Sequence, residues 1–178
     1  MEELEDPTER LRETMEAAEE QKERWTLSVA LSTAIIAVLA AIAGLYGNHH
    51  ANEAMLDQIK SSDQWAYYQS KSIKSEITAA TSQILSALDK PLPAESEEKK
   101  KQYAEEKAEI RKEAEEAHES SEKHMRQHVV LSRSVTIFQI AIAISAIAIL
   151  TRKKLMWYVS LLLAVAGCVF LLMGFMTH

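Results

Sequence analysis

Three long apolar segments alternate with strongly charged segments along the chain. Residues 26–46 and 155–176 contain no charged side chain, and residues 129–150 contain only Arg133, close to the start of the segment. Each segment has about the ~20 residues that an α-helix needs to cross the hydrocarbon core of a bilayer. The pattern therefore predicts an all-α membrane protein with three transmembrane helices.

Residues 47–128, between the first two apolar segments, have the pattern of a helical hairpin outside the bilayer. In the first arm, apolar side chains recur every seven residues, with two more in the alternate position: Ile59, Ala66, Ile73 and Ala80, then Ile77 and Ile84. Pro91 and Pro93 break the helix and predict a turn near residues 89–94. The second arm has its own stripe, formed by Tyr103, Ile110, Ala114, Ala117, Ser121, His124, His128 and Leu131. These stripes predict a coiled-coil-like hairpin.

Two thin and partly polar arms bury little apolar surface. We therefore expect the hairpin to pack against copies of itself. Small side chains also follow one face of two spans, at Ala30, Ala34, Ala37, Ala41 and Gly44, and at Ser160, Ala164, Gly167 and Gly174. Such faces let membrane helices approach closely, so they pack either the three spans of one chain or the spans of neighbouring subunits.

Positive charges beside the spans predict the topology. Residues 151–154, between the second and third spans, contain Arg152, Lys153 and Lys154, and Lys22 and Arg24 precede the first span. Short loops rich in Lys and Arg stay in the cytoplasm. The tail, residues 1–25, is therefore expected inside, while the hairpin and the C-terminus are expected outside. The tail itself is either an acidic helix continuous with the first span or a solvated arm.

The net charge of −6 comes from the tail alone, because residues 1–25 contain ten acidic and four basic side chains. An acidic tail and a neutral remainder disfavour nucleic acid as a partner. The single cysteine, Cys168, lies in an apolar segment, so no disulfide framework is expected. No motif of a nucleotide-binding protein, hydrolase or zinc protease occurs in the sequence. We therefore expect no catalytic residues and no enzymatic activity.

Four histidines form two pairs at the ends of the hairpin region. His49 and His50 follow the first span, and His124 and His128, four residues apart on one helical face, precede the second span. Facing pairs of this kind suit zinc or copper, or a pH sensor. The alternative is that they are polar spacers or solvated side chains.

Two other groups of residues are candidates for contacts. Trp65, Tyr67 and Tyr68, with Lys71 and Lys74, combine aromatic and cationic side chains as protein interfaces do. Alternatively, they pack the two hairpin arms together.

Gln139 in the second span needs a hydrogen-bond partner in lipid. It either bonds a neighbouring helix or lines a pore, in which case Arg133 at the outer mouth favours anions.

The segment around the aromatic residues, S-D-Q-W-A-Y-Y-Q-x-K-S-I-K at residues 62–74, resembles domain-of-unknown-function family 4337 of small bacterial membrane proteins. The resemblance extends over most of the chain. It implies a location in the bacterial inner membrane and a periplasmic hairpin, and it implies no activity, ligand or catalytic residue.

The features together favour a membrane scaffold that forms homo-oligomers in the lipid bilayer, with an unknown periplasmic protein as a further partner. The second hypothesis is a small oligomeric channel lined by the second span, and the third is a metal or pH sensor.

Overall fold

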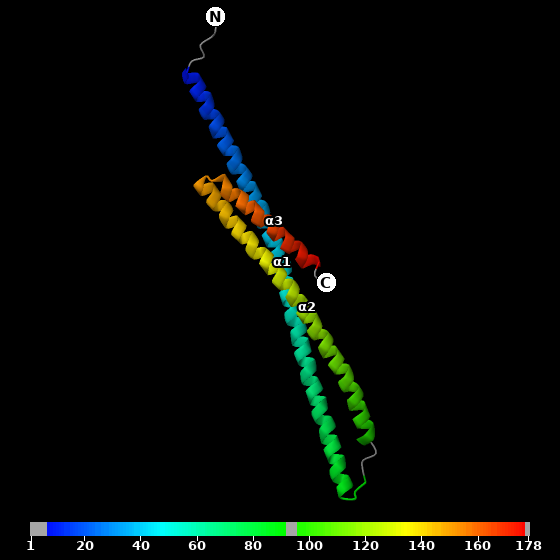
Figure 1. The fold of residues 1–178 in the computed structure, drawn as a ribbon. Helices are drawn as coiled ribbons and strands as arrows, with labels where there is room; N and C mark the ends of the chain where they lie inside the picture. The colour runs from blue at the N-terminus through cyan, green and yellow to red at the C-terminus, as the bar shows by residue number, and fades with distance from the viewer. Residues whose placement is uncertain (1–6, 92–95, 177–178) are drawn as a thin grey trace. The chain divides into compact units, whose positions relative to one another are not determined.

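The structure, a computed structural model, describes residues 7–91 and 96–176. The described residues form three α-helices without a strand: α1 (Pro7–Ala87), α2 (Ser96–Thr151) and α3 (Lys154–Met176) (Figure 1). Each helix contains a segment long and apolar enough to cross a membrane. The predicted all-α class with three spanning segments is confirmed.

Helix α1 runs without interruption from the acidic tail through the first apolar segment and into the hairpin. From Pro7 onward the tail is therefore helical, as one of the two alternatives for it predicts; residues 1–6 lie outside the described part of the chain. Gly47 does not end the helix, because one interior glycine costs only about 1 kcal/mol and a helix gains a hydrogen bond for each residue it adds.

The helix ends are defined by two residues in the left-handed region. Asp89 has φ 50°, and Lys90 N donates a hydrogen bond of 3.0 Å to the carbonyl of Leu85, which closes the end of α1. Residues 92–95 of the predicted turn lie outside the described residues. Arg152 has φ 57°, and only Arg152 and Lys153 separate α2 from α3. The connection is thus shorter than the predicted loop of residues 151–154.

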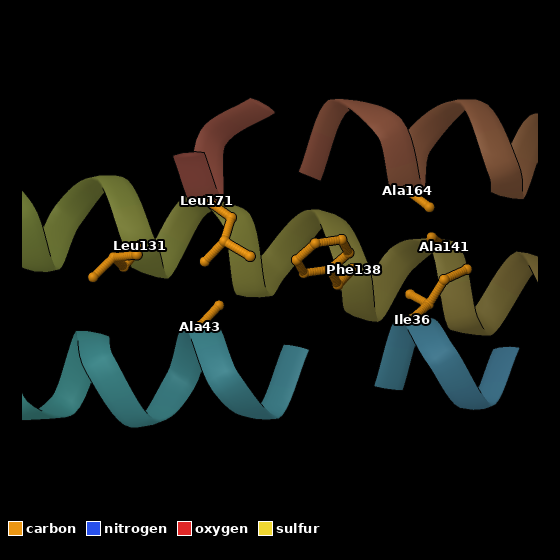
Figure 2. Close-up of a cluster of buried hydrophobic side chains, with 7 residues drawn as sticks. All are labelled: Ile36, Ala43, Leu131, Phe138, Ala141, Ala164 and Leu171. Carbon is orange, nitrogen blue, oxygen red and sulfur yellow. The ribbon is translucent and has the colours of Figure 1, made fainter. Parts of the chain in front are cut away.

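Residues up to Gly47 and from Val129 onward form one compact unit, called here the membrane unit. Its apolar core contains side chains from all three helices (Figure 2): Ile36, Ala43, Leu131, Phe138, Ala141, Ala164 and Leu171. Helix α3 turns a regular face to this core, formed by Ser160, Ala164, Gly167, Leu171 and Gly174. The predicted small-residue face of the third span therefore packs within the chain.

Hydroxyl groups join the helices of the membrane unit. Ser134 Oγ donates to the carbonyl of Gly167, and Ser160 Oγ donates to the carbonyl of Ala141, both at 2.8 Å. Both serines are fully buried. A carbonyl that already accepts its helical hydrogen bond has a second lone pair, so these bonds join α2 to α3 without breaking either helix.

The small-residue face of the first span has a different position. Ala30, Ala34, Ala37 and Ala41 are exposed in the membrane unit, while the buried side of α1 is formed by Val29, Ile36 and Ala43. Packing within the chain thus uses the side of α1 that carries Val29, Ile36 and Ala43, with Gly44 half-buried beside it. The alanine face remains available to another helix.

Residues 48–128 form the second compact unit, the hairpin, in which the α1 and α2 arms lie side by side (Figure 1). On α2 the predicted stripe is buried at Ile110, Ala114, Ala117 and Ser121. On α1 the buried residues are Ala54, Ser61 and Ser82. The predicted apolar stripe of α1 is not buried between the arms: Ile59, Ile73, Ile77 and Ile84 are all exposed. The two stripes of the predicted coiled-coil-like hairpin therefore do not form its core together.

The packing of α3 against α2 predicts that Gly167→Ala destabilises the membrane unit by about 1–3 kcal/mol. A Cβ at this position would lie 2.7 Å from Cε1 of Phe138, whose ring is fully buried in the core. The free energy of unfolding in mixed micelles, titrated with a denaturing detergent, measures the effect.

Gly44→Ala is the matched control, because a Cβ there would meet only Val135 Cγ2 at 3.9 Å, an ordinary contact. It should be neutral or mildly stabilising, since alanine favours the helix. Equal stability of the Gly167→Ala and Gly44→Ala proteins would contradict the described packing.

Candidate functional site

The seam between the hairpin arms consists mostly of small side chains. On α1 it follows Ala54, Ser61, Tyr68, Ser75 and Ser82, which recur every seven residues and are all buried or half-buried. A heptad repeat keeps one helical face toward a partner whatever the polarity of its side chains. This heptad repeat is present in the sequence, but a search for apolar repeats misses it because most of its side chains are polar.

Serine hydroxyls again join the two helices. Ser61 Oγ donates to the carbonyl of Ala114 at 3.0 Å, and Ser121 Oγ donates to the carbonyl of Ala54 at 2.7 Å. Beside them, Ser120 Oγ donates to Oδ2 of Asp57 at 2.6 Å. The seam is thus held by directed polar contacts rather than by a broad apolar surface.

The aromatic segment gives the arms their main charged contact. Lys71 Nζ lies 2.5 Å from Oε2 of Glu106 and sits between two rings, 5.2 Å from the centre of Tyr67 and 5.6 Å from that of Tyr103. The Lys71 side chain is only 14 % exposed. This ion pair is therefore better shielded from water than a surface pair, which contributes little to stability.

The other predicted contact residues divide between the seam and the surface. Trp65 packs edge-on against Tyr68, with ring centres 5.6 Å apart, and Lys107 Nζ lies 5.5 Å from the Tyr68 ring centre. Tyr68 is half-buried, whereas Trp65, Tyr67 and Lys74 are exposed. Packing between the arms thus accounts for Tyr68 and Lys71, while Trp65 and Tyr67 contact these two residues and remain exposed, as Lys74 does.

The exposed apolar side chains of the α1 arm form one continuous surface, called here the apolar stripe. Its members are Met55, Ile59, Ala66, Ile73, Ile77, Ala80, Ile84 and Leu88. Their spacings of four, seven, seven, four, three, four and four residues place them on one face of the helix. Along most of the arm this face points away from the seam, and the fold of one chain leaves it exposed.

One end of the apolar stripe borders a groove of about 690 Å³ between the arms. Met55 and Ile59 from α1 and Met125 from α2 supply apolar lining, and Arg126 and His128 supply polar groups. Methionine side chains adapt to irregular partners. The stripe and the groove therefore form one continuous apolar surface.

The four predicted histidines occupy different environments. Nδ1 of His50 and Nδ1 of His124 are 2.9 Å apart across the seam, and both rings are half-buried. The ring centre of His49 is 5.5 Å from that of His50, but His49 itself is exposed. His128, half-buried, follows His124 by one helical turn. The structure thus brings one histidine of each predicted pair into contact.

In the membrane unit, Gln139 and Arg133 are both exposed on α2. No hydrogen bond of the Gln139 amide is found among the described residues. An amide on the outer surface of a spanning helix favours a partner from another helix, because lipid offers none.

These features define a class: an all-helical protein with three helices suited to crossing a membrane and a long helical hairpin. Residues 25–177 match the family model described as Domain of unknown function (DUF4337), and the chain belongs to this family. No curated protein and no solved structure matches the chain.

The Lys71–Glu106 pair predicts a pH dependence of stability. Lys71 lowers the pKa of Glu106 below its ordinary value of 4.5, chiefly through the hydrogen bond between them, and Glu106 raises the pKa of Lys71. A carboxylate with a lowered pKa stabilises the fold fully above its ordinary pKa, and the contribution is lost as the pH falls through the folded-state value.

The protein should therefore lose more stability between about pH 6 and about pH 3 than its Glu106→Gln variant does. Thermal unfolding followed by circular dichroism measures the difference, with Glu115→Gln as the control. Glu115 is half exposed and pairs with Arg111, one turn away on its own helix. If Glu106→Gln keeps the full pH dependence, the ion pair does not support the hairpin.

Proposed function

We propose that this protein is a membrane-anchored scaffold whose copies associate through the apolar stripe of the α1 hairpin arm. The exposure of that stripe is the observation that carries the proposal. Ile73, Ile77, Ile84 and Leu88 are each 57–61 % exposed in the single chain. Complete burial of such a side chain contributes about 1.5–3 kcal/mol, so covering several of them drives association. Soluble surfaces with continuous apolar patches are usually interaction sites.

The spacing of the stripe favours a second copy of the same helix as its partner. Ile59, Ala66, Ile73 and Ala80 recur by seven, as the core positions of a coiled coil do. Copies inserted in a membrane in the same orientation present their arms in parallel. Each stripe then meets the same residues of its neighbour, which makes the surface self-complementary. In such a dimer, the isoleucines of one arm pack against the equivalent isoleucines of the other, and the same contact recurs along the arm.

The membrane unit supports the same assembly. The exposed alanine face of α1, at Ala30, Ala34, Ala37 and Ala41, lets a second helix approach closely in lipid. The exposed Gln139 amide gains a hydrogen-bond partner when α2 of another copy lies beside it. Both features belong to helices that continue into the hairpin.

The proposed location is the bacterial inner membrane, with the tail and the Arg152–Lys153 connection in the cytoplasm and the hairpin in the periplasm. The positive charges beside the spans support this orientation. The hairpin then offers Trp65, Tyr67 and Lys74 to the periplasm, where a different protein can bind while the apolar stripe holds the copies together.

The mass of the protein in mild detergent tests the proposal. Light scattering coupled to size-exclusion chromatography should show an oligomer, and Ile73→Lys combined with Ile77→Lys should reduce it to smaller species. Two lysines in the stripe place charges where the association would bury them. Gln83→Lys is the matched control, because Gln83 is exposed on the same arm but lies on its side toward α2, beside Ser82 and Lys100.

A monomeric wild-type protein, or equal behaviour of the stripe variant and Gln83→Lys, would contradict the proposal.

The second candidate function, a channel lined by α2, rests on the exposure of Gln139 and Arg133. Ion flux in proteoliposomes that Gln139→Leu abolishes would favour the channel over the scaffold.

A further inference from the structure

The two hairpin arms bring a pair of nitrogen donors together near the residues that join the hairpin to the apolar segments of the chain. His50 on α1 and His124 on α2 face each other through their Nδ1 atoms, 2.9 Å apart. Their rings are nearly parallel, with an interplanar angle of 28° and centres 5.2 Å apart. Both side chains are half-buried. The contact is therefore part of the packed seam between the arms and is not a contact between exposed side chains.

A short contact between two Nδ1 atoms requires one proton between them. One imidazole donates its Nδ1–H and the other, neutral, accepts with the Nδ1 lone pair. Burial lowers the pKa of His50, and the nearby His124 and His49 lower it further. The neutral imidazole, which the pair requires, is also the form that binds metal ions.

Further donors lie one helical turn away on each arm. Glu53 follows His50 by three residues, and His128 follows His124 by four, so each shares a helical face with its histidine. Both are half-buried, and both act electrostatically on His50. Among the residues that the structure describes, no group of three such side chains already converges on one point. Side-chain rotation from this arrangement is needed to complete a coordination shell.

We propose that His50 and His124 are the first two ligands of a binding site for a divalent transition-metal ion such as zinc, completed by Glu53 or His128. A tetrahedral zinc ion at about 2.0–2.1 Å from each nitrogen places the two nitrogens about 3.4 Å apart. The observed pair must therefore open by only about half an ångström. The donor imidazole moves its proton from Nδ1 to Nε2, so two neutral rings bind the ion without releasing a proton.

Zinc binding at this site does not require the proposed association through the apolar stripe, because its ligands come from the two arms of one chain. A bound ion would join α1 to α2 at the end of the hairpin nearest to the apolar segments in sequence. Binding to the folded hairpin alone would raise its stability by mass action. The Ile73→Lys, Ile77→Lys protein should bind zinc as the wild type does, so failure of one proposal leaves the other standing.

Isothermal titration with Zn²⁺ tests the proposal on the full chain in detergent, purified without a histidine tag and freed of metal with a chelator. At about pH 7.5, where neutral imidazole predominates, one ion should bind per chain. His50→Asn and His124→Asn should each weaken binding by at least about tenfold, because each removes one of few ligands. Circular dichroism establishes that both variants remain helical.

His118→Asn is the matched control, since His118 lies on α2 with its side chain 52 % exposed and pairs with Glu122 on its own helix. It should leave zinc binding unchanged. As a second measurement, zinc should raise the unfolding temperature of the wild type and of His118→Asn but not that of His124→Asn. The absence of saturable binding, or equal loss in His118→Asn and His124→Asn, would overturn the proposal.

Discussion

The contact that recurs throughout this protein is a serine hydroxyl that donates to a backbone carbonyl of the neighbouring helix. It joins α2 to α3 at Ser134 and Ser160 in the membrane unit, and α1 to α2 at Ser61 and Ser121 in the hairpin. Such a bond forms only when two helices approach closely, which requires small side chains at the contact. Each contributes about 0.5–1.5 kcal/mol. The same kind of hydrogen bond therefore joins the helices in both units, although the membrane unit is rich in apolar residues and the hairpin is rich in charged ones.

Close approach of the two hairpin arms excludes large apolar side chains from the surface between them. When small residues such as Ala54 and Ser61 occupy the inner face of α1, isoleucines cannot occupy it as well. Ile73 and Ile77 consequently lie on the opposite face, exposed to solvent. The arms hold together through serines and the shielded Lys71–Glu106 pair, and the apolar surface that drives most protein association remains uncovered. The fold of one chain thus leaves exposed the surface through which we propose that copies associate.

The sequence predicted much of the fold, because long uncharged segments and proline breaks have few alternative structures. The three helices and their apolar segments follow from residues 26–46, 129–150 and 155–176. The direction of the α1 stripe could not be predicted, because two heptad patterns share that arm and apolar residues usually face inward. The contact of His50 with His124 depends on the register between the arms, 74 residues apart in sequence, which periodicity leaves undetermined. The contacts of Lys107 with Tyr68 and of Glu106 with Lys71 could not be predicted either. Nothing in the sequence distinguishes these two residues from the many other lysines and glutamates of α2.

Disulfide cross-linking in membranes shows whether the apolar stripe joins copies of this chain. Cys168 is the only cysteine, so Cys168→Ser provides a background free of thiols. Added to it, Ile73→Cys places a thiol within the stripe, and Gln83→Cys places one on the same arm away from it. Parallel arms bring equivalent core positions within reach of a disulfide, whose Cα atoms lie about 4.4–6.8 Å apart. Oxidation should give covalent dimers through Ile73→Cys and few through Gln83→Cys; equal yields, or none at position 73, would contradict the account.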